Sequence, residues 1–405
     1  MNNISDIHDC YGCGVCATAC ICKIIKVGLN ADGFYEPFIT DKSQCTGCGI
    51  CREVCSYLYD ELSLKEFFIK SYAVWSKDYA VRRKCSSGGV SFEIGQTLLN
   101  QGYKVCGVRY NTKLARAEHY IATTTKELIQ SVGSKYIQSY TMDGFMAINR
   151  KEKYLITGTP CQIDSFRRYI QKYHCEENFV LLDFFCHGVP SMLVWQKYIK
   201  ELEQKVGKIT YASWRNKYMG WHDFWTIGID EVEYGEKINW NDSFNMLIMG
   251  RKSFLNSRFS QGDMFYSLFL SDSCLGKQCY EHCKYKYDHS SADIRIGDLW
   301  GKTYNDNEDG VSGVVTFTKK GDEVLKQCNC IFIEHPLEVV AEGQMKTSPI
   351  KGNLYKKLMP VLKNKDYSIE DVIMVLKRYG KNQKNIDRVV HPLRSIKNVI
   401  KKTFR

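Results

Sequence analysis

The sequence lacks the features of membrane, secreted and nucleotide-hydrolysing proteins. Its 405 residues contain no run of about 18 apolar residues, and no basic stretch followed by an apolar one opens the chain, so we predict neither a transmembrane segment nor a secretory signal. No G-x-G-x-x-G motif follows a predicted strand and no G-x-x-x-x-G-K-[ST] motif occurs, which argues against an NTPase and against direct use of NAD(P)H. We expect a cytoplasmic protein.

Cysteine, by contrast, is abundant. The chain has 19 cysteines, and in a long chain without a secretory signal this number indicates metal or cluster binding in a reducing compartment rather than disulfides. The formal net charge is +11. Two or three four-iron clusters held by thiolates would lower that charge by roughly 4 to 6 units. Because the remaining charge is mild, we expect no nucleic-acid partner.

Eight of the cysteines form two copies of one motif. The pattern C-x2-C-x2-C-x3-C starts at Cys10 and returns at Cys45. It is typical of bacterial two-cluster ferredoxins, in which the last cysteine of each run binds the other cluster. The predicted [4Fe–4S] ligands are therefore Cys10, Cys13, Cys16 and Cys55 for one cluster, and Cys45, Cys48, Cys51 and Cys20 for the other. Structural zinc is the alternative, but it usually shows two separated pairs of ligands rather than two interleaved quartets.

The pattern after this repeat alternates between strands and helices, so the fold class is predicted to be α+β, with a mixed α/β domain behind a small module. Asp32-Gly33 predicts a hairpin turn inside the module. We expect helices over 57–70, 86–100, 162–173 and 192–203, and strands over 72–81, 104–110, 153–156 and 179–185. The predicted domains are a module at 1–65, a larger unit at 66–360 with parts at 66–150 and 151–360, and a basic helical tail at 361–405.

One predicted loop combines serine and glycine. Ser86-Ser87-Gly88-Gly89 precedes a helix, so either serine is expected to cap the helix while the glycines let backbone N–H groups approach an anion. A phosphate group is one interpretation of this loop. An ordinary capped helix start is the other.

Two later loops carry sulfur. Residues 157–162 read T-G-T-P-C-Q and place Pro160 in the first turn of a helix, and we interpret Cys161 as buried packing. Cys186 and His187 end another apolar strand. Adjacent strand residues point to opposite faces, so a ligand or cofactor contact is favoured over a nucleophile paired with a base.

A further group of cysteines lies close together near residue 280. Three cysteines need a fourth ligand to hold a cluster, and the end of the strand before His187 offers one. The cysteines predicted for a possible third [4Fe–4S] cluster are Cys186, Cys274, Cys279 and Cys283. The alternative is zinc bound with the help of His282 or His289.

Five further blocks of sequence occur in a fixed order: Cys85 to Gly89, Gly133 to Ser139, Gly158 to Gln162, Cys186 to Ser191, and Ile294 to Gly301. With the cysteine repeat, they resemble the beta-subunit family of coenzyme F420-reducing hydrogenases and dehydrogenases, particularly its bacterial members. The resemblance extends over most of the chain. One departure is the gap of three residues between Cys279 and Cys283, where the family has a tighter C-x2-C.

The resemblance implies a cofactor and a set of contacts to it. It implies a ferredoxin-like module followed by a flavin-binding domain, with FAD exchanging single electrons with the clusters and taking part in a hydride-type exchange. The residues that it implies at the flavin are Ser86, Ser87, Gly88, Gly89, Lys135, Thr159, Pro160, Gln162 and His187.

Two functions fit these features. The first is an oxidoreductase that receives electrons from a ferredoxin-like donor and reduces, or in the reverse direction oxidises, a small-molecule substrate at FAD. The second is an electron-relay subunit without its own substrate, which serves a partner hydrogenase, dehydrogenase or reductase. A pocket at the flavin favours the enzyme, and an exposed apolar patch beside the clusters favours the relay. A regulatory zinc protein is a third possibility, which iron binding would exclude.

Overall fold

The computed structural model describes residues 2–65, 68–206, 208–209, 211–215, 217, 220–222, 226–230 and 254–390. Among these residues, none of the helices is both long enough and apolar enough to cross a membrane. The predicted basic tail lies partly outside the described residues, because the description ends within it at residue 390.

The N-terminal part contains two short helices that begin in the same way. Helix α1 spans Val15–Ala19 and helix α2 spans Ile50–Glu53, and each starts after a glycine in the left-handed region, Gly14 at φ 72° and Gly49 at φ 77°. Only glycine adopts this conformation at little cost, so each cysteine run contains its own turn. The antiparallel strands β1 (Ile25–Leu29) and β2 (Tyr35–Ile39) form the predicted hairpin between the runs.

The predicted helix over 57–70 is wrong. Among the described residues only a 3-10 turn forms, η2 at Ser56–Leu58, and residues 59–65 and 68–69 carry no helix before strand β3, which begins at Lys70. Ser63 uses its backbone N–H and its hydroxyl to bond the carboxylate and the backbone carbonyl of Asp164. These tertiary hydrogen bonds replace the hydrogen bonds that a local helix would have made.

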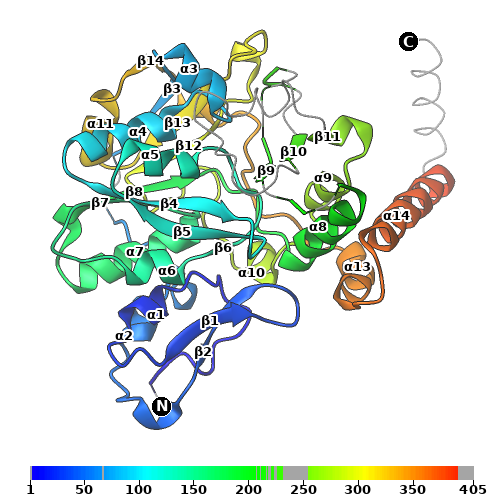
Figure 1. Cartoon of the computed structure of the whole chain (residues 1–405), viewed down its shortest axis with the longest axis horizontal. Helices are drawn as coiled ribbons and strands as arrows, with labels where there is room; N and C mark the ends of the chain where they lie inside the picture. Colours follow the sequence, from blue (N-terminus) through cyan, green and yellow to red (C-terminus); the bar gives the residue numbers. More distant parts are fainter. Residues whose placement is uncertain are drawn as a thin grey trace.

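A mixed sheet of nine strands forms the centre of the large unit (Figure 1), in the order β14-β3-β13-β12-β8-β7-β4-β5-β6. Strands β4, β7, β8 and β12 are parallel neighbours, and the remaining pairs are antiparallel except β5 with β6. The bounds are β3 Lys70–Ser76, β4 Lys104–Asn111, β5 Arg116–Ala122, β6 Ser139–Tyr140, β7 Tyr154–Thr157, β8 Phe179–Phe184, β12 Ile294–Asp298, β13 Ser312–Thr316 and β14 Cys330–Glu334.

Helices cover both faces of this sheet. Helices α4 (Val90–Asn100), α5 (Thr125–Leu128) and α11 (Lys319–Lys326) pack into one apolar core. Helices α6 (Met142–Met146) and α7 (Pro160–Lys172) form the core of the opposite face together with α1 of the N-terminal part. Figure 1 shows the N-terminal part beneath α6 and α7. The large unit therefore presents α7 to the cysteine runs.

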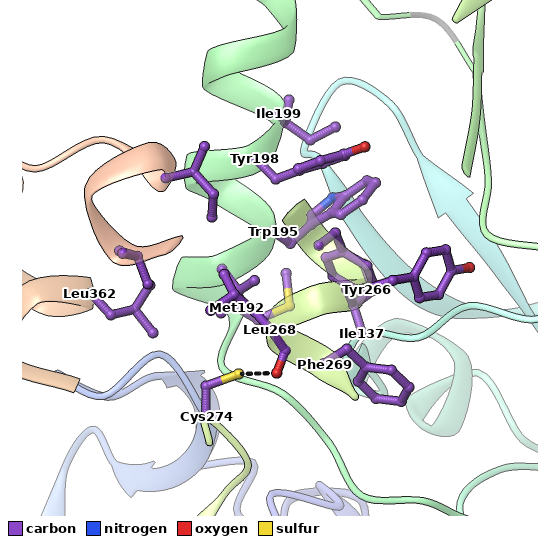
Figure 2. Close-up of a cluster of buried hydrophobic side chains, with 14 of the residues drawn as sticks. Ile137, Met192, Trp195, Tyr198, Ile199, Tyr266, Leu268, Phe269, Cys274 and Leu362 are labelled. Atoms are coloured by element: carbon purple, nitrogen blue, oxygen red, sulfur yellow. Dashed lines mark hydrogen bonds between the residues drawn. The ribbon is translucent and has the colours of Figure 1, made fainter. Parts of the chain in front are cut away.

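A group of helices forms a further core beside the sheet, here called the helical core. It contains α8 (Met192–Val206), α9 (Met264–Phe269), α13 (Asn353–Lys363) and α14 (Ile369–Val390). Trp195, Tyr198 and Tyr266 pack at its centre (Figure 2). The other elements are α3 Tyr79–Lys84, α10 Lys277–Glu281, α12 Leu337–Val340, the 3-10 turns Lys42–Gln44, Ile129–Ser131, Glu176–Asn178, Phe259–Gln261 and Lys302–Tyr304, and a three-stranded sheet of β9 Tyr211–Ser213, β10 Thr226–Asp230 and β11 Phe254–Arg258.

Most of the predicted elements of the large unit are confirmed to within a few residues, but two need correction. The strand over 72–81 ends at Ser76, because Asp78 accepts hydrogen bonds from the N–H groups of Ala80 and Val81 and so starts helix α3. The helix over 86–100 begins only at Val90. The mixed α/β architecture is as predicted, and the division into domains stays a prediction.

Candidate functional site

Four cysteines from the two runs meet in the N-terminal part. Cys10, Cys13, Cys16 and Cys55, here called the inner quartet, line one small cavity together with Tyr11 and Ser165. Burial raises the pKa of each thiol, and neighbouring members of the quartet raise it further in Cys10, Cys16 and Cys55. Cys55 comes from the second run, so the structure brings together the crossed-over set predicted for one cluster.

The other four cysteines, Cys20, Cys45, Cys48 and Cys51, are here called the outer quartet. Cys51 is buried, and its pKa is raised by burial and then by the nearby thiols of Cys20 and Cys48. Cys45 accepts a hydrogen bond from the Asn3 amide at 3.3 Å, which lowers its pKa. Cys48 is exposed. This set therefore lies at the surface of the N-terminal part.

A third group of thiols gathers around the first turn of α7. Cys186, Cys279 and Cys283 lie near one another, since neighbouring thiols of this set raise the pKa of Cys186 and Cys279 after burial. Cys161 belongs to this group: burial and then Cys186 and Cys279 raise its pKa. Cys161 is buried, as the sequence interpretation expected, but that interpretation did not place it beside Cys186 and Cys279.

The structure does not bring Cys274 to this group. Its side chain is fully buried in the helical core, where the thiol donates a hydrogen bond to the Leu268 carbonyl at 3.6 Å (Figure 2). Burial and then the charge of Asp272 raise its pKa to about 12. The order of the strands contained the missing signal, because β7 and β8 are parallel neighbours. The loops after them, which carry Cys161 and Cys186, must meet at one edge of the sheet.

No group of three or more His, Cys, Asp or Glu side chains in the described ranges converges on a point that one metal ion could occupy. The two histidines considered for zinc have other neighbours. His282 contacts the Tyr57 ring edge-on, with centroids 5.2 Å apart, and His289 is exposed beside Asp288. A four-iron cube places its cysteine sulfurs around a larger centre than a single zinc ion does.

Helix α7 links the inner quartet to the third group. Cys161 and Ser165 are one turn apart, and Ser165 Oγ lies 3.3 Å from Cys13 Sγ. Tyr11 follows Cys10 in sequence and packs edge-on against Tyr285, with ring centroids 5.7 Å apart. Burial and then the charges of Cys161 and Cys283 raise the pKa of Tyr11. Tyr11 and helix α7 thus lie close to both thiol groups.

A cavity of about 390 Å³ lies at the carboxyl ends of β7, β8 and β12 and reaches the first turn of α4. This is the expected position for a ligand in a mainly parallel sheet. Seven of the nine predicted flavin contacts line it, namely Ser86, Ser87, Gly89, Lys135, Thr159, Gln162 and His187. Cys186 of the third group also lines this cavity.

The other two predicted contacts, Gly88 and Pro160, do not line the cavity. A Cβ atom at Gly88 would lie 2.4 Å from the Val74 carbonyl oxygen, so this glycine allows the loop to pack against β3. Pro160 is the buried first residue of α7, where a missing N–H costs no helix hydrogen bond. Both residues shape the cavity from behind.

The start of α4 is not capped by a serine, in contrast to the prediction. The N-cap is Gly89 at φ 85°, and no side chain bonds the first turn. Ser87 instead donates to the Val311 carbonyl, and Ser86 Oγ accepts from the Ser134 N–H. Backbone N–H groups of the first helical turn therefore border the cavity without a side-chain cap, as at an anion-binding helix terminus.

Lys135 supplies a cation to the same cavity. Its Nζ donates to the carbonyls of Ser131 and Val132, at 2.9 and 3.2 Å. Burial lowers the pKa of Lys135 to about 7. On another wall, the His187 Nε2 atom lies 2.6 Å from Asp272 Oδ1. Because the lysine bonds only neutral carbonyls, an anionic ligand would stabilise its charged form.

Two buried cations missed by the sequence analysis hold the serine loop in place. Arg215 forms a two-point ion pair with Asp298, which lines the cavity, and also donates to the Ser86 carbonyl at 3.2 Å. Lys217 donates to the Ser87 carbonyl at 2.5 Å. No motif surrounds either residue in the sequence, and only the folded chain places them at the loop.

Two family descriptions match the chain, one for each half of the coenzyme F420 hydrogenase/dehydrogenase beta subunit. The description of its N-terminal domain matches residues 71–144, and the description of its C-terminal domain matches residues 151–334. Together they span well over half of the sequence. The chain belongs to the beta-subunit family of coenzyme F420 hydrogenases and dehydrogenases.

Other comparisons add little to this assignment. No curated protein matches the chain. Among solved structures, it is similar to a chain of the F420-reducing [NiFe] hydrogenase complex from Methanosarcina barkeri, in a xenon-derivatised structure. The TM-score is 0.43, with 16% sequence identity over 80% of this chain and 94% of that chain.

Membership of the beta-subunit family gives the chain a redox role, since the family belongs to oxidoreductase complexes. The two family matches contain the whole lining of the cavity up to Ser312 and all four thiols of the third group. Both cysteine runs lie outside the matched residues, in the N-terminal part. The chain thus combines the family's body with an additional cysteine-rich part.

Proposed function

We propose that the protein is an iron–sulfur flavoprotein oxidoreductase that carries electrons between clusters in its N-terminal part and FAD in the large cavity, and there reduces or oxidises a small-molecule substrate. The observation that carries the proposal is the continuous arrangement of the outer quartet, the inner quartet, the thiols around Cys161 and the cavity. Clusters would supply one-electron transfer, and FAD would supply the change to two-electron chemistry.

The inner and outer quartets fit four-iron clusters. Three closely spaced cysteines with left-handed glycines allow the backbone to curl around a cube, and Gly12 donates its backbone N–H to Cys10 Sγ at 3.4 Å. The crossed-over Cys55 completes the inner set. We assign a third [4Fe–4S] site to the thiols of Cys161, Cys186, Cys279 and Cys283, in which Cys161 takes the place predicted for Cys274.

The cavity fits a long anionic cofactor. Lys135 and the first turn of α4 would bind phosphate oxygens, because both offer N–H donors that no charged group of the protein neutralises in the described contacts. Cys186 and His187 form the wall nearest the third thiol group. A ring system at that wall would lie close to the cluster ligands and would contact the apolar side chains of Phe184 and Phe269.

The test is anaerobic purification followed by measurement of iron, sulfide, zinc and flavin per chain. We expect about twelve irons, as three four-iron clusters require, with one FAD and no stoichiometric zinc. About eight irons would remove the third site but keep the ferredoxin-type pair. Iron without flavin, after incubation with FAD, would overturn the flavoprotein proposal.

Lys135 allows a second test through pH. Its pKa of about 7 in the free protein lies far below the ordinary lysine value. The free protein therefore loses the ammonium charge as pH rises through 7, and affinity for FAD should fall by up to about tenfold per pH unit above that point. Equilibrium dialysis of FAD between pH 6 and pH 9 measures this slope. In Lys135→Gln the slope should vanish, and an unchanged slope there would assign it to another group.

An electron-relay subunit is the alternative, favoured by one specific feature. Ile21 is 74% exposed directly after Cys20, and Phe38 is 51% exposed on the adjacent hairpin. Exposed apolar side chains beside the outer quartet are suited to a partner redox protein. A protein that binds FAD, exchanges electrons only when a partner enzyme is added and binds no small molecule in the cavity would favour the relay.

A further inference from the structure

One side chain of the large unit contacts the sulfur of an inner-quartet cysteine. Ser165 is fully buried on α7, and its Oγ lies 3.3 Å from Cys13 Sγ. The same oxygen accepts the backbone N–H of Ser56 at 3.1 Å and pairs with the Ser56 hydroxyl at 2.7 Å. Ser56 directly follows Cys55, another member of the inner quartet. Ser165 thus joins Cys13, and through Ser56 the chain next to Cys55, to α7.

The direction of the hydrogen bonds among Cys13, Ser165 and Ser56 depends on whether Cys13 is a free thiol or a cluster-bound thiolate. A free thiol donates to Ser165 Oγ, and Ser165 then donates to the Ser56 hydroxyl, which can in turn donate to the Cys161 carbonyl at 3.3 Å. A cluster-bound thiolate has no hydrogen to donate and only accepts. Ser165 must then turn its hydrogen to Cys13 Sγ, and its oxygen still accepts from the Ser56 N–H and can accept from the Ser56 hydroxyl.

We propose that Ser165 is a positioning residue that raises the reduction potential of the inner cluster through a hydrogen bond to Cys13 Sγ. The inference rests on the proposed function, because it requires a cluster on the inner quartet. A donor at a ligand sulfur stabilises the additional negative charge of the reduced cluster more than it stabilises the oxidised one. The bond is strong because both atoms are shielded from water.

The outer quartet has a matched but weaker contact. Asn3 donates its side-chain amide to Cys45 Sγ at 3.3 Å, but Cys45 is only partly buried and its neighbour Thr46 is exposed. Water competes with this donor and contributes hydrogen bonds of its own. The difference favours an electron on the inner cluster, beside the helix that carries Cys161. Ser165 therefore directs electrons toward the large unit.

The test is an EPR-monitored redox titration of the intact, cluster-loaded protein. In Ser165→Ala, the potential of one cluster should become more negative, by up to a tenfold change in its reduction equilibrium, which is 59 mV for a one-electron couple. Iron content should not change. Ser165→Thr retains the hydroxyl and should restore most of the potential. Potentials equal to wild type in a fully loaded Ser165→Ala protein would overturn the inference.

Two control variants keep the test decisive. Asn3→Ala should shift the other cluster and leave the Ser165-dependent one unchanged, and a shift of the same cluster in both variants would contradict the assignment. Ser56→Ala removes only the supporting hydroxyl, so a smaller negative shift of the Ser165-dependent cluster is expected even if Ser165→Ala does not fold. No shift in Ser56→Ala would then count against the inference. Absence of iron from the wild-type protein would instead refute the proposed function.

Discussion

The inner and outer quartets have the same cysteine spacing but very different surroundings. All four inner cysteines are at most 9% exposed, whereas in the outer quartet only Cys51 is buried and Cys48 is exposed. The inner quartet contacts α7 through Ser165, while the outer quartet comes from helix α2, which carries Cys51, and from the chain around the ends of the two short helices. Spacing specifies the kind of ligand set, and position in the fold specifies what the set can exchange electrons with.

With a cluster on each quartet, as proposed, this difference would give electron transfer through the N-terminal part a fixed order. The outer cluster at the surface would be accessible to a separate protein, and the inner cluster beneath α7 would face the large unit. Electrons would then pass between the two clusters in the same order in either direction of transfer. This order depends on the crossed-over sets, because any other pairing of the cysteines would mix the buried positions with the surface ones.

Replacing the crossed-over cysteines should have the largest effect. Cys55→Ala should remove the inner cluster and Cys20→Ala the outer one, each with a loss of about four irons. Only Cys55→Ala should also stop electrons from reaching the cavity when the outer cluster is reduced, because it removes the site beside α7. Iron analysis and stopped-flow absorbance measure the two results. If Cys20→Ala instead abolished the cluster that responds to Ser165→Ala, the assignment of the two sets would be reversed.

The third thiol group extends the comparison into the large unit. Cys161→Ala should lose about four irons, since it removes a proposed ligand. Cys274→Ala should keep all iron and instead lower the stability by about 1 to 2 kcal/mol, because it leaves a small space in an apolar core. Iron per chain and thermal unfolding separate the two outcomes. Loss of iron in Cys274→Ala alone would restore the original ligand prediction.

Features that depend on local spacing could be predicted from the sequence, and features that depend on position in the fold could not. The positions of Cys55 beside the first run and of Cys20 beside Cys51 agree with the sequence pattern, because each copy of the motif contains its own turn, at Gly14 or Gly49, and the pairing of these cysteines as cluster ligands stays a prediction. Helix α7 and the strands around it were also predictable from local apolar patterns. Local sequence is sufficient where the contacts that decide the structure are local.

The misplaced residues depend on contacts between distant parts of the chain. Cys161 could be recognised only by knowing that β7 and β8 are neighbours, and Arg215 only by knowing that it reaches Ser86. The helix expected over 57–70 fails for the same reason, because Asp164 takes the hydrogen bonds of Ser63. Each error comes from a tertiary contact that local propensity does not contain.

Removing a hydrogen-bonding side chain between the N-terminal part and α7 should lower the free energy of unfolding more than removing one in the outer loops. Asp164 is fully buried and accepts from the Ser63 N–H, the Ser291 hydroxyl and the Tyr285 hydroxyl, at 2.6 to 2.9 Å. Asp164→Ala leaves these donors unsatisfied and should cost about 3 kcal/mol. Asp41→Ala removes an exposed cap in the outer loop and should cost far less. Anaerobic thermal unfolding compares the two variants, and equal losses would contradict a buried contact at α7.

The rate at which a chelator removes iron should also differ between the quartets, because only the outer quartet is open to solvent. This is the smallest of the expected effects. Chelators remove iron from sites that they can reach, and an exposed cysteine such as Cys48 leaves the outer cluster open. With an iron chelator under anaerobic conditions, we expect the outer cluster to be lost about tenfold faster than the inner one, a difference of about 1.4 kcal/mol in activation free energy. EPR spectra recorded during the reaction follow the two clusters separately.

Two variants should change the ratio of the two rates of cluster loss. Asn3→Ala should widen this ratio by opening the loop at Cys45, whereas Ser165→Ala should narrow it by loosening the contact at Cys13. Loss of both clusters at one rate would show that the N-terminal part opens as a whole, and burial beneath α7 would then not distinguish the two sites.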